Sequence, residues 1–179
     1  SCEFKATLEK AREASGWREK KGKLPRGRGI GVGCGGFVSG AGYPIYRSDF
    51  PHSNAMIRVL EDGTAASLFI AASEIGQGSD TVLCQIAADE LGIRYEDVLM
   101  RECDSDISPL DLGAYSSRVT LMAGNAVKMA AANVKSKLFV FAGAKLGVAP
   151  AELEAKAGRI FAKNDSGVCI PWDEAARFA

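Results

Sequence analysis

The sequence predicts an α+β fold, with a mixed sheet that contains a β-hairpin and packs on two main helices. Two strand-like segments, 55–60 and 67–72, flank the turn sequence 61–64, Glu-Asp-Gly-Thr, which is typical of a hairpin. Two later segments space their apolar residues as helices do, one beginning near residue 79 and the other spanning 119–146. This mixture of elements indicates an α+β or mixed arrangement rather than a regular array of βαβ units.

The chain begins with a segment that predicts a helix over residues 3–17. The apolar residues near one stripe of this helix are Phe4, Leu8, Ala11 and Trp17. A basic linker over 20–28 follows, and the glycine-rich segment 29–42 predicts a strand that another backbone approaches closely. We therefore divide the chain into an N-terminal helix and linker, 1–28, and a larger domain, 29–179.

The loop 73–79 follows the hairpin and leads into the first main helix. Ser79 or Asp80 can cap that helix, because a short polar side chain can accept a hydrogen bond from the first free N–H groups. Gly92 suits the position just past its last turn. The helical spacing rests on Val82, Leu83, Ile86, Ala87 and Leu91.

A short strand over 98–101 and an acidic loop over 102–115 separate the two main helices. The second helix, 119–146, is rich in alanine, valine, methionine and phenylalanine. Gly124 and Gly143 lie inside it, where each costs ~1 kcal/mol relative to alanine. This cost predicts that another backbone packs closely against both glycines.

The end of the chain predicts two short strands on either side of Gly158-Arg159, then a helix that begins near Trp172, after Pro171. No capping or stop signal precedes Ala179. We therefore expect the sequence to be part of a longer domain.

The charge is unevenly distributed along a chain whose formal net charge is zero. Residues 1–28 hold nine Lys or Arg against four acidic residues, whereas 49–114 hold thirteen acidic residues against three basic ones. No aromatic stacking platform or recognition motif accompanies the basic segment, so it predicts a solvated helix face and linker rather than a nucleic-acid interface. No apolar run is long enough to predict a membrane span.

The five cysteines are widely spaced, no Cys-x-x-Cys occurs, and His52 is the single histidine. This pattern does not favour a zinc or iron–sulfur site built by this chain, so no metal ligands are predicted. Scattered thiols are typical of a cytoplasmic protein.

One glycine motif resembles a dinucleotide fingerprint. Residues 31–36 match Gly-x-Gly-x-x-Gly, but a basic linker precedes them and no helical pattern follows. A dinucleotide site requires a strand before the motif and a helix after it. We therefore reject the nucleotide interpretation.

A second glycine motif, Gly76-Gln77-Gly78, lies between a buried strand and a helix start. Glycines allow a ligand to approach the backbone closely, and a helix N-terminus attracts anionic or oxygen-rich groups. Gln77 can donate and accept hydrogen bonds without carrying charge. The alternative is a tight turn with a glutamine that faces solvent.

The segment 111–118 repeats this device in front of the second main helix, with Ser116 and Ser117 close to the helix start. The alternative here is an ordinary serine N-cap. Asp104, Asp106 and Asp111 could hold a hard cation, but they lack the spacing of a calcium-binding loop, which favours a solvated acidic loop.

Taken together, these motifs resemble the molybdopterin-binding subunit of the xanthine oxidase and aldehyde oxidase family, the molybdenum hydroxylases. The resemblance covers roughly residues 1–146. It rests on Arg26-Gly27-Arg28-Gly29-Ile30-Gly31, Asp62-Gly63, Glu74-Ile75-Gly76-Gln77-Gly78, Ser116-Ser117 and Gly124-Asn125-Ala126. Residues 111–120 are most similar to the large subunit of 4-hydroxybenzoyl-CoA reductase, a branch that removes a phenolic hydroxyl group reductively.

The resemblance implies a role for each matching residue. It implies that Ile75, Gly76, Gln77 and Gly78 contact the pterin and the metal's oxygen ligand, with Gln77 orienting that ligand as the catalytic residue. It implies that four residues bind the pterin and its phosphate through backbone and hydroxyl donors, namely Ser116, Ser117, Arg118 and Val119.

The resemblance also implies cofactors and partners. These are molybdopterin with molybdenum in the cytosine dinucleotide form, iron–sulfur and flavin (FAD) subunits or domains, and an aromatic substrate. The family's other cofactor loops and its catalytic glutamate have no counterpart in this sequence. We therefore expect the chain alone to carry no molybdenum, to be inactive, and to require the remaining segments of the subunit.

Two other functions compete with this one: a non-catalytic interaction or assembly domain derived from the same fold, and an unrelated α+β binding module. A structure in which the two helices did not begin together would favour the unrelated module. Because the helix 119–146 is apolar around most of its circumference, we also expect the chain to self-associate when neighbouring segments are missing.

Overall fold

The computed structural model describes residues 3–36, 53–101 and 103–179. The chain divides into two compact units, 1–38 and 39–179. The predicted boundary after residue 28 remains a prediction.

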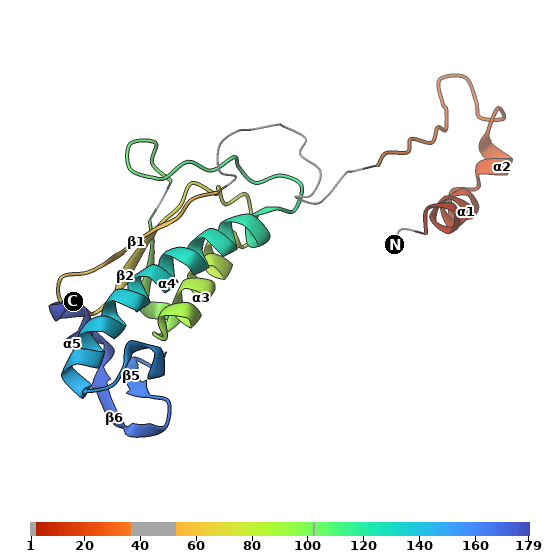
Figure 1. The fold of residues 1–179 in the computed structure, drawn as a ribbon. Helices are drawn as coiled ribbons and strands as arrows, with labels where there is room; N and C mark the ends of the chain where they lie inside the picture. Colours follow the sequence, from red (N-terminus) through yellow and green to blue (C-terminus); the bar gives the residue numbers. More distant parts are fainter. Residues whose placement is uncertain (1–2, 37–52, 102) are drawn as a thin grey trace. The chain divides into compact units, whose positions relative to one another are not determined.

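The first unit contains two helices where the sequence predicted one over 3–17. Helix α1 spans Phe4–Ala14 and helix α2 spans Trp17–Lys20 (Figure 1). The single-helix prediction is wrong because Gly16 adopts a left-handed φ of 63°, which ends the helical path between them. The predicted strand 29–42 is also wrong over 29–36, where five of the eight residues are glycines and no strand forms; its remainder lies outside the described residues.

The second unit is built on a mixed three-stranded sheet, as predicted. Strands β1 (Met56–Val59) and β2 (Ala66–Phe69) form the antiparallel hairpin, and β3 (Val98–Arg101) pairs with β2 in parallel. Helix α3 (Ser79–Leu91) and the short 3₁₀ helix η1 (Tyr95–Asp97) connect β2 to β3. The strand order is β1-β2-β3.

The long helix α4 spans Val119–Leu146, as predicted, and packs along α3 (Figure 1). Both glycines inside it have close neighbours: a Cβ at Gly124 would lie 2.9 Å from the side chain of Ile86, and one at Gly143 would lie 2.6 Å from the carbonyl oxygen of Val148. The predicted approach of another backbone is therefore confirmed at Gly143 but is wrong at Gly124, where the close neighbour is a side chain. The core between the first sheet, α3 and α4 is formed by Leu68, Ile70, Ala72, Leu83, Cys84, Ala87, Ala88, Val98, Val119, Ala123 and Val127.

Contacts along α3 and α4 show that the two helices run in the same direction. Ile86, in the middle of α3, packs against Gly124 in the first part of α4, and Glu90 forms an ion pair with Lys135 further along both helices. Residue numbers therefore rise together on the two helices, and both helices begin at the same end of the unit.

A second sheet follows α4, and it has one strand more than predicted. After the 3₁₀ helix η2 (Pro150–Glu152), strands β4 (Leu153–Lys156), β5 (Arg159–Ala162) and β6 (Asp165–Pro171) form an antiparallel meander. Strand β6 was missed because its first half is polar and exposed, so no alternation of buried residues marks it. The final helix α5 spans Trp172–Phe178. The backbone N–H of Trp172 donates to the carbonyl oxygen of Gly158, and the N–H of Gly158 donates to the carbonyl oxygen of Gly92 at the end of α3.

The outer face of α4 leaves large apolar side chains in solvent. Leu121, Met129 and Val140 are 55%, 68% and 64% exposed, whereas Leu138 is buried. Among the described residues, no helix is long and apolar enough to cross a bilayer.

Candidate cofactor-binding site

The two predicted site segments lie at one end of the second unit. Because β2 and β3 are parallel, the loops that leave their carboxyl ends start from the same edge of the sheet, and these loops lead to α3 and α4. The two helices begin at the same end, as their contacts show. The carboxyl edge of parallel strands, next to helix N-termini, is where open sheets bind ligands most often.

The loop before α3 is organised by the carboxylate of Glu74. One of its oxygens accepts hydrogen bonds from the backbone N–H groups of Gly76 (2.7 Å) and Gly78 (3.0 Å). The other oxygen accepts from the N–H of Asp80 and the hydroxyl of Ser79, both at 3.2 Å. Glu74 therefore supplies the acceptor that free N–H groups at the beginning of a helix require.

This arrangement corrects the predicted helix cap. Helix α3 begins at Ser79 with Gly78 as its N-cap residue, and no side chain of the cap residue bonds to the helix. Neither Ser79 nor Asp80 is the cap. Gly92 ends the helix in a left-handed conformation, as predicted.

The amide of Gln77 is bound within the same loop. Its oxygen accepts a hydrogen bond from the N–H of Ile75 at 2.6 Å. Its NH₂ group donates to the carbonyl oxygen of Ser73 (3.0 Å) and to the hydroxyl of Ser79 (2.9 Å). Both amide protons are engaged, and the amide oxygen retains one lone pair, so the glutamine is oriented rather than freely rotating.

The two glycines beside Gln77 are left-handed and open to their surroundings. Gly76 has a φ of 93° and Gly78 a φ of 78°, and a Cβ built on either meets no atom within 4 Å. The turn therefore requires glycine for its conformation. The backbone on this side is accessible to a ligand.

Two carboxyl groups at the start of α3 have shifted pKa values. The N–H groups of Gly78, Asp80 and Gly76 and the Ser79 hydroxyl lower the pKa of Glu74 from 4.5 to about 2. Desolvation, and then repulsion by Glu74, raise the pKa of Asp80 above its usual value. Glu74 is therefore charged at any physiological pH.

The loop before α4 has strained backbone at both predicted serines. Ser116 and Ser117 adopt φ values of 50° and 54°, a left-handed conformation that costs a non-glycine residue ~1–2 kcal/mol. The N-cap residue of α4 is Arg118, and its side chain makes no capping bond. The alternative of an ordinary serine N-cap is therefore wrong.

A buried ion pair holds this second loop. The guanidinium of Arg118 donates to Asp111 at 2.9 Å, to the carbonyl oxygen of Gly113 at 2.7 Å and to the hydroxyl of Ser53 at 2.7 Å. The side chains of Arg118 and Asp111 are 1% and 0% exposed. The side chain of Arg118 thus binds its own loop and joins it to Ser53. The prediction of a solvated acidic loop is wrong for Asp111, whose side chain is buried.

The two remaining predicted cofactor-binding residues lie in different surroundings. Ile75 is 72% exposed beside Gln77, whereas Val119 is 8% exposed and packs in the core. Sequence reasoning missed the organising roles of Glu74 and Asp111. An acidic residue shortly before a helix start was the available signal for Glu74; nothing local distinguished Asp111 from the other acidic residues of its loop.

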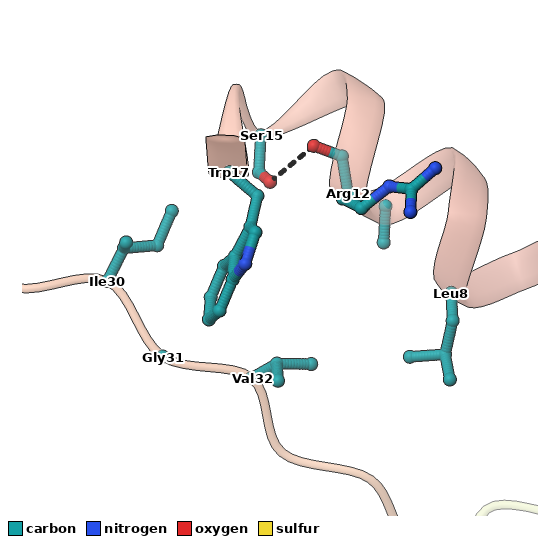
Figure 2. A pocket seen from close by; sticks show the side chains of 8 residues that line it. Leu8, Arg12, Ser15, Trp17, Ile30, Gly31 and Val32 are labelled. Carbon is teal, nitrogen blue, oxygen red and sulfur yellow. Dashed lines mark hydrogen bonds between the residues drawn. The ribbon is translucent and has the colours of Figure 1, made fainter. Parts of the chain in front are cut away.

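A separate apolar pocket lies within the first unit, and none of the predicted cofactor-binding residues lines it. Figure 2 shows the ring of Trp17 facing Ile30 and Val32 across it, with Leu8 at its far side. Its volume is about 350 Å³, and it is lined by Leu8, Ala11, Arg12, Ser15, Trp17, Ile30, Gly31 and Val32.

Residues 8–179 match a family described as the molybdopterin cofactor-binding domain. The putative xanthine dehydrogenase molybdenum-binding subunit of Escherichia coli is 32% identical over 145 residues, which are 78% of this chain and 19% of that protein. The carbon monoxide dehydrogenase large chain of Afipia carboxidovorans is 34% identical over 149 residues, 81% of this chain and 18% of that protein. The chain thus spans about a fifth of these relatives.

Solved structures share the fold. Quinoline 2-oxidoreductase from Pseudomonas putida superposes with a TM-score of 0.67 and 27% identity, over 70% of this chain and 16% of that one. A copper- and molybdenum-containing carbon monoxide dehydrogenase gives a TM-score of 0.64 at 32% identity, over 71% of this chain and 16% of that one. With its two helix-initiating loops at one end of a mixed sheet, the chain belongs to the molybdopterin cofactor-binding domain family of the molybdenum hydroxylases.

Proposed function

We propose that this chain forms one part of the cofactor site of a molybdenum oxidoreductase. Ile75, Gly76, Gln77 and Gly78 lie on the metal side of that site, and Ser116, Ser117, Arg118 and Val119 bind the pterin and its phosphate. The observation that carries the proposal is that parallel helices α3 and α4 begin at the same end, each preceded by one of these loops.

The geometry of the loops fits an oxygen-rich, anionic cofactor. Open space lies over Gly76 and Gly78, so the cofactor can approach the backbone. Two left-handed serines precede α4, whose positive end favours phosphate. Strain of this kind persists where the surrounding structure maintains it, which is common at ligand sites. At the start of α3, the carboxylate of Glu74 accepts from the N–H groups of Gly76, Gly78 and Asp80, and we assign the phosphate to the start of α4.

The cofactor, when bound, supplies the redox chemistry, and the role of Gln77 is orientation. Both protons of its amide are engaged by Ser73 and Ser79. A hydrogen bond donated to an oxygen ligand therefore replaces one of these two bonds, whereas the amide oxygen can accept a bond with no rearrangement. Because the loop limits the amide to these choices, the ligand meets a donor or acceptor in a defined position.

We propose an aromatic substrate, with 4-hydroxybenzoyl-CoA as the specific candidate. The support is the similarity of residues 111–120 to that branch. The reaction replaces a ring C–O bond by C–H, consumes two electrons and two protons, and releases water. Matched proteins named nicotine 6-hydroxylase large subunit and quinoline 2-oxidoreductase also favour the aromatic class.

The complete enzyme is proposed to be a cytoplasmic complex. Its other components are the remaining segments of this subunit, iron–sulfur and flavin (FAD) subunits, and the cytosine dinucleotide form of the cofactor. Relatives named as a "molybdenum-binding subunit", a "large chain" and a "complex subunit gamma" support an assembly of several chains. An assembly domain without catalysis is the alternative, and stoichiometric molybdenum in the complete subunit would exclude it.

The exposed outer face of α4 supports the need for neighbouring segments. Leu121, Met129 and Val140 are each more than half exposed, and burying such a side chain contributes about 1.5–3 kcal/mol. The chain alone is therefore expected to self-associate and to bind apolar dyes. Light scattering over a concentration series tests this; a strict monomer that binds no dye would contradict it.

The role of Gln77 is tested by Gln77→Ala in the complete enzyme, with Gln85→Ala on the exposed side of α3 as the matched control. Loss of an oriented donor lowers kcat by about 10²–10³-fold, while molybdenum content stays at the wild-type level. Gln85→Ala should change neither. A fully loaded Gln77→Ala enzyme with normal kcat would contradict the assignment.

The substrate proposal requires a separate assay. The complete enzyme with a low-potential reductant should convert 4-hydroxybenzoyl-CoA to benzoyl-CoA, detected by mass spectrometry. Oxidation of a nitrogen heteroaromatic compound with a dye acceptor is the matched comparison. If the enzyme converts the heteroaromatic compound but not 4-hydroxybenzoyl-CoA, the substrate proposal is wrong and the enzyme is a hydroxylase. The proposed cofactor site would be unaffected by that result.

A further inference from the structure

Glu74 and Gln77 belong to one hydrogen-bond network that Ser79 joins. The hydroxyl of Ser79 donates to Glu74 at 3.2 Å and accepts from the NH₂ group of Gln77 at 2.9 Å. The same carboxylate accepts from Gly76 and Gly78 on either side of the glutamine. Glu74 therefore bonds directly to the backbone of Gly76 and Gly78, the two neighbours of Gln77. It reaches the side chain of Gln77 through the hydroxyl of Ser79.

The charge on Glu74 determines the polarity of this network. A carboxylate only accepts, so Ser79 must donate its single proton to Glu74 and offer a lone pair to Gln77. The glutamine then turns its NH₂ group to Ser79 and its oxygen to the N–H of Ile75. The donors and acceptors of these bonds therefore match throughout. If the side-chain amide of Gln77 were rotated by 180°, its oxygen would face the carbonyl oxygen of Ser73, and neither could donate.

We propose that Glu74 is the positioning residue for Gln77, holding the loop and, through Ser79, fixing the orientation of the glutamine amide. This inference rests on the proposed role of Gln77 and adds the group that makes that role possible. Its exposed position argues against packing as its purpose. The four donors gathered on one carboxylate argue for a specific function in the loop.

An amide cannot replace the carboxylate, although the two have the same shape. Glutamine has one accepting oxygen and one donating NH₂ group. In Glu74→Gln, whichever way the amide turns, the NH₂ group meets the backbone N–H of Gly76 and Gly78 or the N–H of Asp80. At least one helix-end donor loses its acceptor, and Ser79 no longer has a fixed direction. This variant therefore loosens the loop without removing volume.

The first test is hydrogen exchange of residues 74–80, followed by mass spectrometry on the 179-residue chain. Glu74→Gln should make the protected amides of this peptide exchange about tenfold faster, because bonds to a charged acceptor are stronger than neutral ones. The matched control is Glu61→Gln in the hairpin turn, where the side chain is 93% exposed; it should leave the peptide unchanged. Equal exchange in Glu74→Gln and the wild type would overturn the proposal.

The second test is a double-mutant cycle on kcat in the complete, molybdenum-loaded enzyme. If Glu74 acts through Gln77, Glu74→Gln should lower kcat about tenfold in the wild type and have no further effect in Gln77→Ala. A merely structural role would lower kcat by the same factor in both backgrounds. Additive effects of the two changes would therefore overturn the positioning role.

Ser79→Ala tests the link from Glu74 to Gln77 through the Ser79 hydroxyl separately from the backbone hydrogen bonds to Glu74. It leaves the three N–H bonds to Glu74 in place and removes the hydroxyl between Glu74 and Gln77. We expect near-normal exchange of the loop, a lower kcat, and no further effect in Gln77→Ala. An Ser79→Ala enzyme as fast as the wild type would overturn the link through Ser79. If Gln77→Ala itself left kcat unchanged, the proposed function would fail instead, so the two failures are distinguishable.

Discussion

The loops before α3 and α4 start from the same edge of one sheet and lead to parallel helices, yet they are held in opposite ways. The first loop is exposed, uses glycine at its left-handed positions, and is organised by the exposed carboxylate of Glu74. The second has serine at two of its three left-handed positions, Ser116 and Ser117, with Gly113 as the third, and is held by the buried side chains of Asp111 and Arg118. The first loop is held by an exposed hydrogen-bond network, whereas the second is held by a buried ion pair and carries strained backbone at its two serines.

This difference suggests a division of labour at the proposed site. A surface network can exchange one hydrogen bond for another at little cost, which suits a glutamine that must meet a changing ligand. A buried ion pair loses several kcal/mol if it is broken, which suits the anchoring of a phosphate in one position.

Asp111→Ala should destabilise the second unit most. It leaves the guanidinium of Arg118 buried without its charged partner, which costs about 3–5 kcal/mol of unfolding free energy. Urea unfolding followed by circular dichroism measures the change. Asp106→Ala, at an exposed position of the same acidic segment, is the control and should change stability little. Equal effects of the two variants would show that the ion pair between Asp111 and Arg118 does not hold the second loop.

Gly78→Val should cost less, since only backbone strain is added. A β-branched residue with a φ of 78° costs about 1–2 kcal/mol, although its side chain meets no neighbouring atom. Gly78→Asn is the matched control because asparagine tolerates this conformation. In the complete enzyme Gly78→Val should also lower molybdenum content. If valine and asparagine unfold at the same urea concentration, the glycine is not required for its conformation.

Ser117→Gly should act in the opposite direction. Glycine relieves the left-handed strain, but it also loses more backbone entropy on folding than serine does. The net increase in unfolding free energy should be about 1 kcal/mol or less. Ser117→Ala retains the strain and is the control for loss of the hydroxyl. Thermal unfolding of the three proteins measures the effect. A lower melting temperature for Ser117→Gly than for Ser117→Ala would show that the serine backbone is not strained.

The smallest effect is local and depends on pH. Since folding lowers the pKa of Glu74 from 4.5 to about 2, its contribution to stability is present above pH 4.5 and is lost as the pH falls through about 2. Carboxyl NMR titration should give a midpoint near 2 for Glu74 and a raised one for Asp80. In Glu74→Gln the pKa of Asp80 should fall, because the repulsion is removed; no change would contradict the contact between them.

Much of the fold could be predicted because it follows from periodicity. The bounds of β3 and α4 agree with the predicted ranges, since a run of helical spacing and a short apolar segment are local properties. Strand β6 could not be predicted in this way, because its strand conformation comes from pairing with β5 and not from its own polar residues. The break at Gly16 was missed because the apolar stripe continues across it.

The two loops that carry the predicted site residues could be placed from the sequence, but their internal hydrogen bonds could not. Glycines beside Gln77 and hydroxyl residues before α4 carry a local signal, and they lie where two helices begin. The pairing of Arg118 with Asp111 and Ser53 depends on how distant segments fold together, and four acidic residues near this loop looked alike. That Glu74, rather than Ser79 or Asp80, satisfies the start of α3 required the three-dimensional path of the loop.

The sequence separation of these contacts also predicts an order of folding. The bonds of the first loop join residues no more than six positions apart, so it can form as soon as α3 does. The bond from Arg118 to Ser53 joins residues 65 positions apart, and closing so long a segment is slow because it must wait for β2, α3 and β3 to assemble. We therefore expect the loop before α4, where we propose that the phosphate binds, to become structured after the loop that holds Gln77.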